Sequence, residues 1–82
     1  DPEKAQHHGN ITQADAAFGR LMQALADMNL AENTLVIFTS DNGPEGNGLK
    51  GRTRGSTGGL RGRKRSVYEG GIRVPFMVRW PG

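Results

Sequence analysis

The sequence contains no cysteine among its 82 residues. Disulfide bonds and metal sites built on thiolates are therefore excluded. Aromatic residues make up only 6% of the chain, and no apolar run is long enough to span a membrane. The first residue is not Met, no signal-peptide pattern is visible, and the last residues read as a strand that should continue. We therefore expect an internal fragment of a larger domain.

A chain of 82 residues can form at most one small domain. Hydrophobic residues account for 34% of this chain, and 13 of its residues are glycine. Such a short chain buries a modest fraction of its surface, and its net free energy of folding is close to zero without a covalent or metal staple. We therefore expect the chain to be poorly stable on its own.

The charges are unevenly distributed along the chain. Residues 1–46 carry two basic residues against seven acids, whereas residues 47–65 carry seven basic residues and no acid. A basic block of this kind is typical of a solvated face, a nucleic-acid patch or a site for an oxyanion. No aromatic residue lies between Lys50 and Arg65, and single-stranded nucleic acids need aromatic stacking platforms. We therefore do not expect a nucleic-acid partner.

Apolar side chains in residues 10–28 recur at steps of three and four, which predicts a helix with one apolar face. Pro2, with an acid beside it, offers an earlier start for this helix, and Gly9 is its weak point. We expect Asn29 to end the helix in a left-handed conformation. The apolar stripe, which we expect to be core, comprises Ile11, Ala14, Phe18, Leu21, Met22, Leu25 and Met28.

Two short β-rich runs follow the helix. Residues 34–39 predict a strand of a parallel or mixed sheet that is covered on both faces. A long glycine- and arginine-rich loop is expected over residues 43–65, and a bend over residues 66–71. Residues 73–79 predict a second strand, in which Pro75 must lie at the start or on an edge. The expected fold class is thus α/β, in the order helix, strand, long loop and strand.

Asp41 and Asn42 stand at the end of the first expected strand. In open α/β sheets, ligands bind just beyond the carboxyl ends of the strands. Carboxylate and amide oxygens are the ligands that Ca²⁺ and Mg²⁺ prefer. Asp, Asn, Gly and Pro are equally the standard residues of turns. The pattern by itself therefore fits either a metal site or a simple strand-terminating turn.

Lys64 lies in the glycine- and arginine-rich stretch, and its ammonium is a point charge suited to a tetrahedral oxyanion. Gly70 and Gly71 permit a close approach of the backbone or a positive φ. Glu69 and Arg73 can pair across the bend and hold it. From the residues alone, a mobile basic loop followed by an edge strand explains this segment equally well.

Three motifs stand in order along the chain, namely "TSDNG", then "GRKRSVYEGGIRVP", and finally "WPG". Their combination, order and separation resemble the sulfatase family of the alkaline-phosphatase-like superfamily. The resemblance covers essentially the whole chain and is specific, because all three motifs agree together. It implies that residues 1–82 are a partial sulfatase catalytic domain with an alkaline-phosphatase-like mixed sheet.

The resemblance implies a role for each residue that matches a family motif. Asp41 and Asn42 match the pair that coordinates a divalent cation, usually calcium. Lys64 matches the lysine that contacts the sulfate of the substrate, which makes it both a substrate-binding and a catalytic residue. A mainly structural segment of the family, which shapes the site, is matched by Glu69, Gly70, Gly71, Arg73 and Pro75.

The activity implied by the resemblance is the hydrolysis of aryl or carbohydrate sulfate esters. The implied partner is thus a sulfated small molecule or glycan, and the implied location is an exported one, whether periplasmic, secreted or lysosomal. A phosphoesterase or phosphonate hydrolase of the same superfamily is the alternative, since a metal and a lysine suit phosphate as well. The Glu-Gly-Gly bend that follows Lys64 favours the sulfatase.

The chain departs from the family pattern at the nucleophile. Sulfatases use a formylglycine made from the first residue of a Cys/Ser-x-Pro/Ala-x-Arg motif, and this chain contains no such motif. The family's N-terminal Asp-Asp metal ligands and upstream catalytic histidine are also missing, and we do not assign that role to His7 or His8. We therefore expect the formylglycine in the rest of the catalytic domain and no activity from this chain alone.

Overall fold

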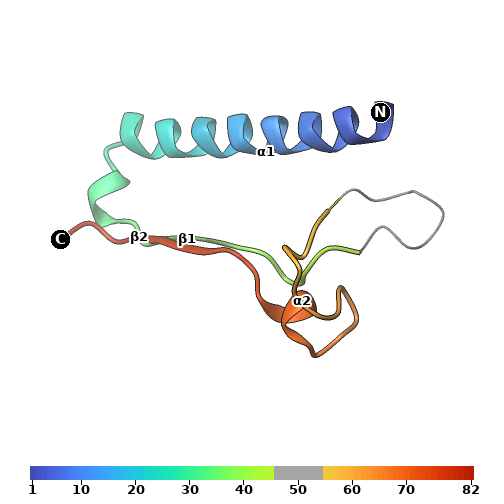
Figure 1. Cartoon of the computed structure of the whole chain (residues 1–82). Coiled ribbons are helices and arrows are strands. Elements are labelled where there is room, and N and C mark those ends of the chain that lie inside the picture. The colour runs from blue at the N-terminus through green and yellow to red at the C-terminus, as the bar shows by residue number, and fades with distance from the viewer. Residues whose placement is uncertain (46–54) are drawn as a thin grey trace.

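The computed structural model describes residues 1–45 and 55–82, and in these ranges it consists of helices and one two-stranded sheet. The long first helix lies along the sheet, and the loops and the short second helix gather at one end of it (Figure 1). In chain order the elements are α1 (Pro2–Asp27), the 3-10 helix η1 (Ala31–Asn33), β1 (Val36–Thr39), α2 (Glu69–Ile72) and β2 (Phe76–Arg79).

Helix α1 begins at Pro2, as its sequence predicts. The side chain of Asp1 caps this end, because it accepts hydrogen bonds from the backbone N–H groups of Glu3 and Lys4 at 3.0 and 3.4 Å. Proline suits the first helical position, where its missing N–H would have no partner within the helix. The helix continues without a break through Gly9, so the expected weak point does not interrupt it.

The end of α1 follows its sequence as well. Asn29 adopts a φ of 59°, which confirms the predicted left-handed residue after the helix. The backbone N–H of Leu30 donates to the Leu25 carbonyl at 2.8 Å, and this bond closes the last turn. The hydroxyl of Thr34 then donates to the Leu30 carbonyl at 2.6 Å, which directs the chain from η1 toward β1.

Strands β1 and β2 pair antiparallel, with Val36 opposite Arg79 and Thr39 opposite Phe76. Both strands were correctly predicted, although each begins two or three residues later than expected. Pro75 lies directly before β2, as its missing N–H requires, and its carbonyl accepts a hydrogen bond from the Thr39 hydroxyl at 2.9 Å. The antiparallel pairing is compatible with the expected mixed sheet and not with a purely parallel one. The sense of these two strands depends on a long connection and not on local sequence.

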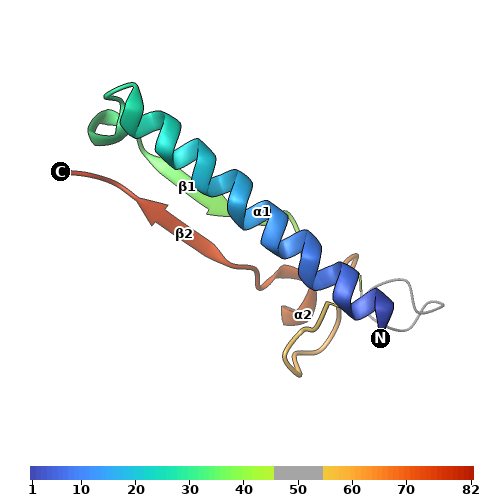
Figure 2. The ribbon, with the colours of Figure 1, turned by 90° about the horizontal axis from the view of Figure 1, so that it is seen from above.

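Helix α1 lies over β1 and runs along it (Figure 2). The rings of Phe18 and Phe38 meet edge to face between the two elements, with their centroids 5.3 Å apart. The expected cover on both faces of β1 is absent within residues 1–45 and 55–82, where Ile37 remains 52% exposed. The expected core is correspondingly incomplete: Phe18, Met22 and Leu25 are half-buried, whereas Ile11, Ala14, Leu21 and Met28 are exposed.

The predicted bend over residues 66–71 is in fact partly helical, because α2 makes one turn from Glu69 to Ile72. The predicted pairing of Glu69 with Arg73 is confirmed, with a distance of 3.2 Å between the guanidinium and the carboxylate. The predicted close approach of the backbone at Gly70 and Gly71 is also confirmed. A Cβ atom on either glycine would overlap a backbone carbonyl of the loop packed against α2.

The expected long loop over residues 43–65 lies partly outside the described residues, since these omit residues 46–54. Its two described flanks, residues 43–45 and 55–65, lie beside α2 at one end of the sheet (Figure 1). None of the helices in the described part of the chain is long and apolar enough to cross a membrane.

Candidate functional site

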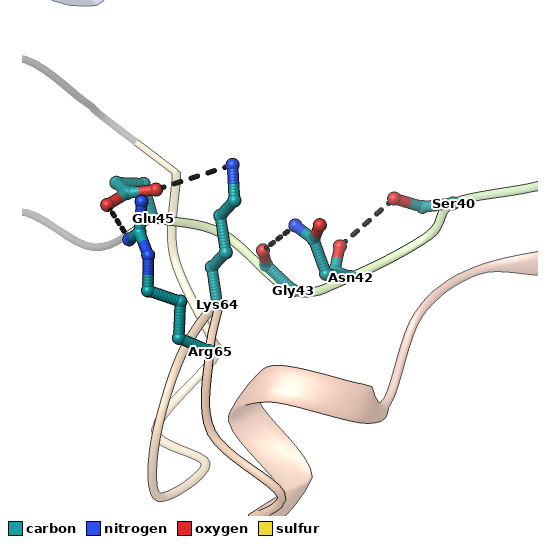
Figure 3. A network of polar contacts seen from close by, with 6 residues as sticks. All are labelled: Ser40, Asn42, Gly43, Glu45, Lys64 and Arg65. Carbon is teal, nitrogen blue, oxygen red and sulfur yellow. Dashed lines mark hydrogen bonds and ion pairs between the residues drawn. The ribbon is translucent and has the colours of Figure 1, made fainter.

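Asp41 and Asn42 lie in the turn that leaves the carboxyl end of β1. The hydroxyl of Ser40 donates to the Asn42 carbonyl at 3.0 Å and tightens this turn. The side-chain nitrogen of Asn42 donates to the Gly43 carbonyl at 2.7 Å (Figure 3). This bond fixes the orientation of the amide, so that the side-chain oxygen of Asn42 is left to accept from a donor or to bind a cation.

The Asp41 carboxylate is exposed, and no hydrogen bond or ion pair with another described residue engages it. An anionic oxygen and a neutral amide oxygen on adjacent residues fit a hard divalent cation such as Ca²⁺. Two such residues fill only part of the six to eight oxygen positions that Ca²⁺ takes. No group of three or more His, Asp or Glu side chains that could complete a shell occurs in residues 1–45 and 55–82.

Two backbone hydrogen bonds bring the segment that carries Lys64 to this turn. The Lys64 N–H donates to the Pro44 carbonyl at 2.9 Å, and the Gly43 N–H donates to the Gly71 carbonyl at 2.8 Å. Gly43 is buried, and a Cβ atom there would overlap the Gly70 carbonyl, so only glycine permits this contact. Asp41, Asn42 and Lys64 thus come from segments joined at one corner of the structure, at the end of β1. Figure 3 shows Asn42 and Lys64 in this corner.

The Lys64 ammonium does not stand alone in this corner. It lies 3.6 Å from one carboxylate oxygen of Glu45, while the Arg65 guanidinium donates to the other oxygen (Figure 3). We call these three residues the Glu45 cluster. The hydrogen bond from Arg65 is the main reason that the pKa of Glu45 lies below its ordinary value, and the positive charges of Arg65 and Lys64 add to this effect.

Sequence reasoning did not find the pairing of Glu45 with Lys64 and Arg65. A signal for it exists, because Glu45 is the only acid between Asp41 and Glu69. A single carboxylate close in sequence to seven basic residues is expected to form an ion pair with one of them, but the sequence does not identify which one. The fold selects Lys64 and Arg65 because the backbone bond between Lys64 and Pro44 places them beside Glu45.

Another basic residue of the loop has a local structural role. The Arg61 guanidinium lies 4.0 Å from the centre of the Tyr68 ring, which is a cation–π contact. The Arg61 carbonyl accepts a hydrogen bond from the Gly70 N–H at 2.7 Å and fastens α2 to the loop. Three further basic residues of the predicted basic block lie outside the described residues: Lys50, Arg52 and Arg54.

The family model described as Sulfatase matches residues 3–82. The chain is 48% identical over 73 residues to arylsulfatase A of Homo sapiens, and this alignment covers 89% of the chain and 14% of that protein. It is 47% identical over 75 residues to steryl-sulfatase of Mus musculus, with 88% of the chain and 12% of that protein covered. It is also 46% identical over 78 residues to N-acetylgalactosamine-6-O-sulfatase of Bacteroides thetaiotaomicron, and this alignment covers 87% of the chain and 15% of that protein.

The chain therefore spans about a seventh of the length of the curated relatives that it matches. No solved structure matches it significantly. The family match nevertheless extends over almost every residue, from the start of α1 to the end of the "WPG" motif. The family carries an alkaline-phosphatase-like fold, with which a helix on a small sheet agrees. This chain belongs to the sulfatase family and is a fragment of the parent domain.

Proposed function

We propose that this chain is part of a metal-dependent enzyme that hydrolyses sulfate esters, and that it supplies two metal ligands and a sulfate-binding lysine. The observation that carries the proposal is the corner at the end of β1. There, two backbone hydrogen bonds hold the segment of Lys64 against the turn that presents Asp41 and Asn42. Ligands of α/β sheets bind at this end of the strands.

Each residue has a distinct role in the proposed site. Asp41 would bind the cation through its charged carboxylate oxygens. Asn42 would bind it through its side-chain oxygen, because its side-chain nitrogen is already hydrogen-bonded to the Gly43 carbonyl. A divalent cation bound there would supply Lewis-acid polarisation of a sulfate oxygen. Lys64 would bind the sulfate and offset the negative charge that grows on its oxygens during the reaction. The nucleophile, a formylglycine, would come from the part of the enzyme outside these 82 residues.

The proposed substrate class is a sulfate ester of a small aryl compound or of a carbohydrate. The names of the three relatives point to aryl, steryl and amino-sugar sulfates. These compounds share the sulfate group. The proposed roles of Asp41, Asn42 and Lys64 concern binding of the sulfate and not of the alcohol that carries it. We further propose, from the family alone, that the intact enzyme is exported.

The test uses the intact protein that carries this chain, with p-nitrophenyl sulfate and p-nitrophenyl phosphate as matched substrates. We expect turnover of the sulfate to exceed that of the phosphate, to disappear on chelation of the metal and to return with added calcium. Preferred hydrolysis of the phosphate would support a phosphoesterase of the same superfamily instead. Undiminished turnover of the sulfate after complete removal of the metal would contradict the proposed role of Asp41 and Asn42.

A further inference from the structure

We propose that Glu45 is a positioning residue whose carboxylate, braced by Arg65, holds the Lys64 ammonium at the end of β1. This inference rests on the proposed function, because it gives Lys64 the sulfate of the substrate as its second partner. Neither the "TSDNG" motif nor the Glu-Gly-Gly motif contains Glu45. The inference comes instead from the contacts of the Glu45 cluster.

The Lys64 side chain needs a partner to hold its charge in one place. A lysine side chain is long and flexible, and it loses rotamer entropy whenever its ammonium is held in one place. The Lys64 side chain is 42% exposed, so packing does not hold it. The one ion pair of its ammonium among the described residues is with the Glu45 carboxylate, at 3.6 Å. Glu45 therefore decides where the Lys64 charge stands before a substrate arrives.

The Glu45 cluster keeps a net positive charge. A carboxylate paired with Lys64 alone would neutralise the ammonium and weaken its attraction for a sulfate. Arg65 removes this difficulty, because its guanidinium engages the other oxygen of Glu45. Glu45 lies 3.6 Å from the Lys64 ammonium, which has three N–H donors, so donors remain for a second anion such as a sulfate. Two cations and one anion leave the Glu45 cluster with one net positive charge for an oxyanion.

Glu45 lies close along the chain to the proposed metal ligands. Glu45 follows Asn42 by three residues, and the intervening Pro44 carbonyl accepts the backbone hydrogen bond of Lys64. The backbone and the side chain of Lys64 are thus both bound to the turn that carries the proposed metal ligands. A shift of this turn would move the metal ligands and the lysine together, which preserves their relative positions. Such preorganisation is what a catalytic charge requires.

The experiment is a double-mutant cycle in the intact enzyme, with kcat and KM measured on p-nitrophenyl sulfate. We expect Glu45→Ala to lower kcat/KM roughly tenfold while the bound calcium is unchanged, because a misplaced charge loses much of its effect. The kcat/KM of Glu45→Gln should lie between that of the unchanged enzyme and that of Glu45→Ala, because the amide oxygen of Gln can still accept a hydrogen bond from the Lys64 ammonium. In the Lys64→Ala background, the same Glu45→Ala change should have no further effect, since the residue through which it acts is gone.

Arg63→Ala is the matched control. Arg63 is an exposed cation of the same loop, and its side chain makes no hydrogen bond or ion pair with a described residue. We expect this variant to keep the kcat/KM of the unchanged enzyme. Glu45→Gln keeps the volume of the side chain, so the test stays decisive even if Glu45→Ala lowers the melting temperature.

The outcomes separate this inference from the proposed function. Full activity of Glu45→Ala, or an equal loss with and without Lys64, would overturn the positioning role of Glu45. The proposed function would still stand in that case if Lys64→Ala alone were severely impaired. Unchanged turnover by Lys64→Ala would instead overturn the proposed function, and the inference about Glu45 with it.

Discussion

At the scale of the residue, Asn42 keeps an oxygen for a ligand because its nitrogen is already bound to the Gly43 carbonyl. Asp41 beside it keeps a whole exposed carboxylate. The two side chains differ in what they offer a cation, since one is anionic and the other neutral. The charged ligand should therefore contribute more to the affinity for a divalent cation than the neutral one.

These residues could be predicted from the sequence, whereas their neighbours could not. Asp41 and Asn42 follow a strand, and Lys64 precedes a distinctive glycine pair, so local pattern and family motif both point to them. Glu45 carries no such signal, because an ion pair across twenty residues depends on how the loop folds back. The side-chain amide orientation of Asn42 is likewise a product of the folded turn.

The ionisation of Glu45 leads to a prediction at this scale. Its pKa is lowered in the folded protein, so the stabilisation from its ion pairs is present at neutral pH and is lost as the pH falls through that lowered pKa. We expect the intact enzyme to melt at a slightly higher temperature than its Glu45→Gln variant near pH 7. The difference should shrink as the pH falls below the ordinary pKa of a glutamate and should disappear below the lowered pKa of Glu45. A melting-temperature difference that grew toward acid pH would refute this assignment.

At the scale of the element, the termini of α1 were predictable because each depends on adjacent residues. Asp1 and Pro2 begin the helix, and Asn29 ends it with a positive φ. The antiparallel sense of β1 and β2 was not predictable, because it is set by the connection of more than thirty residues between them. The helical turn of α2 was missed because two glycines favour a bend locally, whereas packing against the loop selects the helix.

The packing of α2 leads to a prediction about Gly71. A methyl group at this position would overlap the Ser66 carbonyl, which belongs to the backbone and cannot rotate away. We expect Gly71→Ala to destabilise the intact enzyme by about 3 kcal/mol, in the range of strongly destabilising core substitutions. Gly19→Ala in α1 is the matched control, since a Cβ atom there meets no atom of another described element within 4 Å. Equal unfolding free energies of the two variants in urea would contradict the close packing of α2.

At the scale of the whole molecule, one helix lies along β1, and no other described element covers the two strands (Figure 2). No hydrophobic side chain is fully buried within residues 1–45 and 55–82, and Trp80 is 78% exposed. The exposed side chains of β1 and β2 include Ile37, Phe38, Phe76, Met77 and Val78. A contiguous exposed apolar surface of this kind is typical of residues that are buried against other elements in a larger domain.

This exposure leads to a prediction about the isolated chain of 82 residues. Its apolar burial is too small to offset the conformational entropy of folding, so its net free energy of unfolding should be near zero. We expect calorimetry to show no cooperative thermal transition, and p-nitrophenyl sulfate to remain intact in its presence. A sharp transition well above room temperature would show that the chain is a stable domain by itself.

The central claim is that Asp41 and Asn42 hold the metal whereas Lys64 holds the sulfate. Bound calcium and turnover of p-nitrophenyl sulfate, measured together on variants of the intact enzyme, test it most directly. Asp41→Ala should lose the metal and the activity, and Asn42→Ala should weaken the metal less. Lys64→Ala should keep its calcium but lose about a hundredfold in kcat, or on the order of 3 kcal/mol. Full calcium occupancy in Asp41→Ala, or unchanged turnover in Lys64→Ala, would contradict the account.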